Sequence, residues 1–401
     1  MKLYLIVSFF GGNTMIEVTN PKNLYKKVEL AKKQLKNAKT KEEVVALTTY
    51  IEQLYASIGF VSVGDIASLD MKVFANKHHI KANNKKYIIS KDKLIKNYLL
   101  QQDFHRYFFE RVFQGINREM RSLGGDEYSP ITELSKDDYY TIFFEFMSSL
   151  GLSSLFDKYI KNQRIYSGVD DDVNTLGFTI INPLTKEADV FVGDMQYDIY
   201  SMYVLAHEFG HVYDLSRLDG GAKGYNKYRI ESFYQEITSK TFERLFIDFL
   251  LERNILNDET LDLMFDMNNW NYLYIFAAYI ISLLPEEYIV NEEYIDMKRT
   301  QIYKMIKDRF NKKSNVKKVL NRMSDFQELQ EDYSYAYGDV ISLFFKERIK
   351  ESDYSLEVFQ EVFPYRDELF NPEVLDRFDI NPKKYVKLYK KDIELLKKQS
   401  N

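Results

Sequence analysis

The sequence of 401 residues predicts a mainly α-helical protein with a small β-hairpin or sheet near its middle. Two observations predict this class. Apolar residues recur at helical spacing over most of the chain, and one pair of short β-prone runs, at 176–181 and 188–192, interrupts them. Hydrophobic residues make up 45% of the chain and charged residues 29%, which is typical of a folded globular protein.

The first elements are expected to be helices. Stretches 22–38 and 41–58 each carry one apolar stripe at helical period, and Thr40 between them is a natural N-cap. We therefore expect an antiparallel helix pair. Further helical patterns cover 91–123 and 136–161, with glycine and proline breakers between them.

The β-prone runs flank the turn sequence at 182–187 and immediately precede a helix that carries His207 and His211. Helical patterns then continue to the C-terminus. The apolar stretch 272–284 is too short to span a bilayer and is expected to be a buried core helix. The basic stretch 304–322 is expected to be a solvated helix face.

Composition limits the partners and the chemistry. A formal net charge of −5 argues against a nucleic-acid partner, and the apolar stretches argue against a membrane span. The absence of cysteine excludes thiolate metal sites and cysteine nucleophiles, and leaves His, Asp and Glu as metal ligands. It also fits a cytoplasmic protein. Residues 1–14 are expected to be a docked strand or an extension, with an export leader as the alternative.

The segment His207-Glu208-Phe209-Gly210-His211 carries the strongest chemical signal. Residues four apart share one face of a helix, so His207 and His211 can direct two imidazoles at one zinc ion. Glu208 lies about 100° round the helix, where a general base can reach the attacking water. Gly210 is unfavourable in a helix, which suggests that some other group approaches its backbone closely.

A catalytic zinc ion normally has a third protein ligand and one open position. No histidine follows His211, so the candidates are Glu231 and Glu236 on the predicted helical run at 231–252. They lie 20 and 25 residues after His211, and spacing alone leaves both open.

Three segments together resemble a known family: residues 193–211, the Glu-x-x-Ser-x-x-x-Glu pattern at 236–243, and the tyrosine-rich segment 333–337. They are similar to the corresponding motifs of the thimet oligopeptidase and oligoendopeptidase F family of zinc peptidases. The resemblance covers about residues 165 to 350.

The resemblance implies roles for particular residues. It makes Glu236 the third zinc ligand, with Glu231 as the alternative. Tyrosines of the 333–337 segment would stabilise the oxyanion of the substrate, with Tyr337 preferred and Tyr333 or Tyr335 contributing. The strand before the histidines would pair with the extended substrate at Gly177 and Phe178.

The sequence also departs from the family. Asp214 stands where the family usually has a third histidine, and 327–332 lacks the histidine that contacts the substrate. These differences put the family's usual substrates in question more than they do zinc binding.

These observations predict a metallopeptidase with one zinc ion that hydrolyses oligopeptides, built as a multi-helix lobe around a substrate cleft. Residues 1–20 would be an extension or strand, 21–165 a helical region and 166–401 the catalytic region. The oligomeric state is left open. The alternatives are a thermolysin-type or toxin-like zinc endopeptidase that acts on a specific protein, and a peptide-binding descendant without catalysis.

Overall fold

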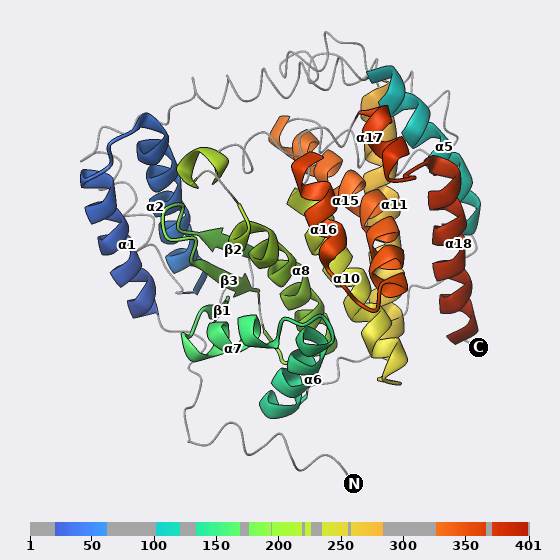
Figure 1. Ribbon diagram of the computed structural model, residues 1–401. Coiled ribbons are helices and arrows are strands. Elements are labelled where there is room, and N and C mark those ends of the chain that lie inside the picture. The colour runs from blue at the N-terminus through green and yellow to red at the C-terminus, as the bar shows by residue number, and fades with distance from the viewer. Residues whose placement is uncertain are drawn as a thin grey trace.

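The computed structural model describes residues 21–61, 102–120, 134–168, 176–193, 195–218, 221–225, 235–255, 258–283, 326–365 and 371–399. Within them the protein is mainly helical, with a three-stranded sheet directly before the helix of the two histidines (Figure 1). The predicted fold class is confirmed. The helices are α1 (Pro21–Lys36), α2 (Lys41–Val61), α5 (Gln102–Met120), α6 (Lys136–Ser149), α7 (Ser153–Lys161), α8 (Ile199–Ser216), α10 (Gln235–Glu252), α11 (Asp258–Ser282), α15 (Phe326–Glu351), α16 (Glu357–Val362), η1 (Phe363–Tyr365), α17 (Pro372–Arg377) and α18 (Pro382–Gln399).

The sheet contains the predicted hairpin and one additional strand. Strands β2 (Gly177–Ile181) and β3 (Ala188–Val192) are antiparallel, and the side chain of Asn182 accepts hydrogen bonds from two backbone amides of the turn. Strand β1 (Ile165–Ser167) pairs with β3 in parallel, so the strand order is β1-β3-β2. The sequence did not predict β1, because three residues are too few to show an alternating pattern.

The two faces of the sheet are covered by different helices. Side chains alternate along a strand, so Gly177 and Thr179 face α8, and Phe178 faces the opposite way. The ring of Phe178 stacks on Phe191 at 4.6 Å and meets Phe60 of α2 edge-on. Figure 1 shows the sheet between the α1–α2 pair on one side and α8 on the other.

The predicted helix pair corresponds to α1 and α2, which pack against each other through one hydrophobic cluster that includes the outer face of the sheet. Lys27 of α1 forms an ion pair with Asp189 of β3, which is 1% exposed. Among the described helices, α2 is long and apolar enough to cross a membrane, and 56% of the relevant window is buried inside the protein. A core helix of a globular protein has the same properties.

Some helix boundaries differ from the prediction. The pattern at 136–161 forms two helices, α6 and α7, because the chain turns at Gly151, whose φ of +70° favours glycine. The core helix expected at 272–284 is the second half of α11, which begins at Asp258. The predictions for 1–20, 304–322 and Glu231 lie outside the described residues.

Helices α8, α10 and α15 pack side by side, with α10 in the middle. Two glycines permit this close approach. A Cβ atom at Gly210 of α8 would lie 2.4 Å from the Cα of Ser239, and one at Gly338 of α15 would lie 2.7 Å from the Cβ of Glu236. The backbone approach that Gly210 suggested is therefore made by α10.

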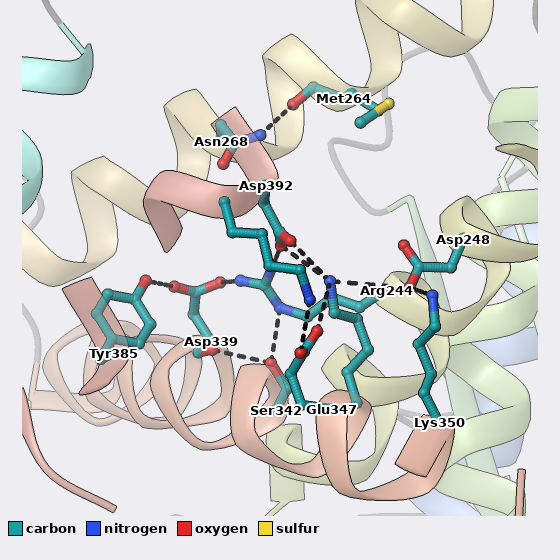
Figure 2. A network of polar contacts seen from close by, with 12 residues as sticks. Arg244, Asp248, Met264, Asn268, Asp339, Ser342, Glu347, Lys350, Tyr385 and Asp392 are labelled. Atoms are coloured by element: carbon teal, nitrogen blue, oxygen red, sulfur yellow. Dashed lines mark hydrogen bonds and ion pairs between the residues drawn. The ribbon is translucent and has the colours of Figure 1, made fainter. Parts of the chain in front are cut away.

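A buried network of charged groups joins α10 to α15 and α18 (Figure 2). Arg244 of α10 is 3% exposed, pairs with Asp339 of α15 and donates a 3.0 Å hydrogen bond from Nε to Ser342. The hydroxyl of Tyr385 in α18 donates to Asp339 at 2.6 Å, and Asp392 lies 3.5 Å from the guanidinium. The network fixes α10 relative to its neighbours.

Candidate metal centre

Helix α8 places the two predicted histidines on one face. Asp198 begins the helix with a capping box, in which its carboxylate accepts from the amide of Ser201 at 2.7 Å. His207 and His211 follow one turn apart, with ring centroids separated by 4.8 Å.

Glu236 of α10 completes a group of three candidate metal ligands. The Nε2 atoms of His207 and His211 lie 3.1 Å apart, and Oε2 of Glu236 lies 3.3 Å from the first and 3.7 Å from the second. Ligands at 2.0–2.1 Å from a tetrahedral zinc ion are separated by about 3.3 Å. The three atoms therefore have the spacing that one small cation requires, and the group could hold a metal ion.

Glu243, two turns after Glu236 on α10, orients His207. Its Oε1 lies 2.6 Å from Nδ1 of His207, and its Oε2 accepts from the hydroxyl of Tyr203 at 2.5 Å and from Nζ of Lys240 at 3.0 Å. A carboxylate on the second ring nitrogen is the usual partner of a metal-binding histidine. This contact leaves Nε2 of His207 directed at the shared point.

Negative charge gathers around this point. Burial lowers the pKa of His207, but Glu236 and Glu243 outweigh burial and raise it to about 10. Burial raises the pKa of Glu236, but the charges of His211 and His207 bring it down to about 2. Two ionised carboxylates thus converge where a proton on His207 or a metal cation can balance them.

Glu208 points from α8 toward β2. It is 2% exposed, and its Oε2 accepts a hydrogen bond from the hydroxyl of Thr179 at 2.8 Å. Burial raises its pKa to about 7, which suits a group that takes up and releases a proton near neutrality. A Cβ atom at Gly177 would lie 2.9 Å from its Oε1 and also 2.9 Å from the backbone oxygen of Phe191, which cannot shift without moving β3, so the position favours glycine.

The predicted tyrosines occupy different environments. The ring of Tyr335 is stacked over His207 with the centroids 6.4 Å apart, and the charge of Glu236, followed by burial, raises the pKa of its hydroxyl. Tyr337 is 1% exposed, and its hydroxyl is hydrogen-bonded to His105 of α5. The side chain of Tyr333 is outside the described part of the structure. Of the two predicted tyrosines whose side chains are described, Tyr335 is the one that lies beside the candidate metal ligands.

Several residues of the site were not predicted from the sequence. Thr179, Lys240 and Tyr203 contact Glu208 or Glu243, yet each belongs to a common residue type and no sequence motif marks it. The side chain of Phe178 lies on the face of the sheet opposite Glu208, and the Gly177 backbone lies beside that carboxylate. Of the two third-ligand candidates, Glu236 belongs to this group, and Glu231 lies outside the described residues.

Comparison with known proteins gives one distant similarity. No protein-family model matches the chain, and no match was found among curated proteins. The chain is similar to a crystal structure described as that of "a putative oligoendopeptidase F from Bacillus anthracis str. Ames", with 10% sequence identity and a TM-score of 0.43. The similarity covers 94% of this chain and 66% of that protein.

Proposed function

We propose that this protein is a zinc metallopeptidase that hydrolyses peptide bonds in oligopeptides and belongs with the oligoendopeptidases. One observation carries the proposal: His207, His211 and Glu236 converge at tetrahedral spacing, with the carboxylate of Glu208 one residue from the first ligand. Two nitrogen donors and one carboxylate without cysteine are the ligand set of many catalytic zinc sites.

The residues divide the reaction between them. A zinc ion held by His207, His211 and Glu236 would act as a Lewis acid, lowering the pKa of a water molecule and polarising the substrate carbonyl. Glu208 takes the proton of the attacking water and returns it to the leaving amine. Thr179 holds the carboxylate of Glu208 by a 2.8 Å hydrogen bond, which fixes the direction from which it acts.

Tyr335 and strand β2 are proposed to contact the substrate. The raised pKa of Tyr335 keeps its phenol protonated, so it can donate a hydrogen bond to the oxyanion of the substrate. Strand β2 is at one end of the strand order β1-β3-β2, and its Gly177 lies beside Glu208. An extended peptide that pairs with this strand would bring its backbone to the general base.

The proposal is tested by metal analysis and a library of quenched fluorescent peptides on the wild type and on Glu208→Gln. We expect about one zinc ion per chain in both proteins, because Glu208 is not among the three ligands. Cleavage should fall by at least about 100-fold in the variant, because a general base contributes at least that factor. A wild type that binds zinc and peptides but cleaves none would instead favour the peptide-binding alternative.

A further inference from the structure

A continuous stack of aromatic rings leads away from the metal centre. The ring of Tyr335 lies 6.4 Å from the imidazole of His207, with 22° between the planes. Tyr274 lies 4.8 Å beyond Tyr335 at 16°, and Trp270 lies 6.2 Å beyond Tyr274 at 30°. In all three pairs the neighbouring rings are nearly parallel, so the four rings form one stacked row that begins at the candidate ligand His207.

Exposure increases along this row. The side chain of His207 is 12% exposed, Tyr335 and Tyr274 are half-buried, and Trp270 is 51% exposed. Trp270 and Tyr274 are four residues apart on α11 and therefore share one helix face. Trp270 is the single tryptophan of the chain, and a large ring that is half in solvent has a free surface for stacking.

We propose that Trp270 is a specificity-determining residue of the proposed peptidase and that it stacks with an aromatic side chain of the peptide substrate. The inference rests on the proposed function. None of the three ring-to-ring steps exceeds 6.4 Å. An extended peptide spans 3.3–3.6 Å per residue, so it reaches Trp270 within about six residues of the scissile bond. The substrate class is therefore oligopeptides with Phe, Tyr or Trp at that distance.

The test uses two unlabelled nonapeptides that are identical except for one residue, Phe or Ala, about five positions from the cleaved bond, which is the distance that the three ring-to-ring steps imply. Their cleavage is followed by chromatography with the wild type, Trp270→Leu and Trp270→Phe. Tyr107→Leu is the matched control, since Tyr107 of α5 is 55% exposed and does not belong to the row. The emission of Trp270 is recorded while each peptide is added to the zinc-loaded Glu208→Gln protein.

We expect Trp270→Leu to raise KM for the Phe peptide about tenfold, with kcat, zinc content and KM for the Ala peptide unchanged. Trp270→Phe should restore most of the preference, and Tyr107→Leu should leave it intact. The emission of Trp270 should shift to shorter wavelength with the Phe peptide only. Equal KM values for both peptides, or unchanged emission at saturation, would overturn the inference alone. Failure of the wild type to cleave either peptide would instead count against the proposed function.

Discussion

At the residue scale, the orienting carboxylate of Glu243 gives the first prediction. Replacing Glu243 by Gln keeps the size of the side chain but removes the charge that holds Nδ1 of His207 at 2.6 Å. We expect zinc affinity to fall by 10- to 100-fold, as when other outer-shell partners of metal-binding histidines are changed. Competition with a chromophoric chelator measures this affinity.

Glu252→Gln provides the matched control for this change. Glu252 lies on the same helix, and its side chain is 51% exposed beside Lys350. Its variant should bind zinc as the wild type does. If Glu243→Gln also retained wild-type affinity, the orienting role assigned to Glu243 would be wrong.

His105 gives a prediction about acid stability. Burial lowers its pKa to about 3, so His105 is neutral in the folded protein and gains a proton near pH 6.5 only after unfolding. The unfolded state therefore binds more protons below pH 6.5, and acidification favours it by about 1.4 kcal/mol per pH unit. His105→Asn should reduce the fall in unfolding free energy between pH 6.5 and 5.5 by about 1 kcal/mol, because the imidazole is only partly protonated in the unfolded state over this interval.

Urea unfolding at the two pH values measures the effect, and comparison between variants cancels the contributions of the other titrating groups. His105→Gln should behave like His105→Asn if the lost imidazole is the cause. An identical pH dependence in all three proteins would show that His105 has the same pKa in the folded and unfolded states.

The part of the candidate site that could be predicted from the sequence is the part whose residues lie close together in the chain. His207, Glu208 and His211 lie within one helical turn, so their pattern is readable without coordinates. Thr179 and Tyr203 act across elements, 29 and 40 residues from the carboxylates they contact, and no local pattern marks them. Tyr335 and Tyr337 are two residues apart on a helix, and only the packing distinguishes their environments.

At the scale of the elements, the buried Arg244 network gives a prediction for stability. Arg244→Met leaves Asp339, which is 0% exposed, without its cation. Loss of one partner of a buried pair costs about 3–5 kcal/mol, and we expect urea unfolding to show this loss.

Arg348→Met is the control for the loss of an arginine. Arg348 lies 2.7 Å from Glu361, but the two side chains are 36% and 56% exposed, so solvent screens the pair. This variant should lose less than about 1 kcal/mol. Equal losses in the two variants would mean that the buried network adds nothing specific to the packing of α10.

The helices and the hairpin were predictable because the apolar residues of each recur at the spacing of its own secondary structure. Stripes at helical spacing indicated α1 and α2, and alternation with a turn between indicated β2 and β3. The split of α6 from α7 depends on one backbone angle at Gly151. The position of α10 between α8 and α15 depends on contacts at Gly210 and Gly338 that join distant parts of the chain. Neither feature leaves a periodic signal.

For the whole molecule, metal removal should change stability. The candidate ligands come from α8 and α10, so a bound ion joins two central helices. An ion at 100 times its Kd stabilises the folded state by about 2.7 kcal/mol. We expect a chelator to lower Tm by several degrees in the wild type, measured by calorimetry, and to have little effect on Glu236→Gln. A chelator shift of the same size in both proteins would place the stabilising ion elsewhere.

The spacing of the two carboxylates on α10 determines where the chain can accept an inserted residue. Glu236 and Glu243 face the same imidazole because seven residues make almost two full helical turns. One residue inserted between them would rotate the second carboxylate by about 100° relative to the first. Such an insertion would turn Glu243 away from His207 while Glu236 still faced it. Residues added in the loop after β2 would leave both carboxylates facing the imidazole.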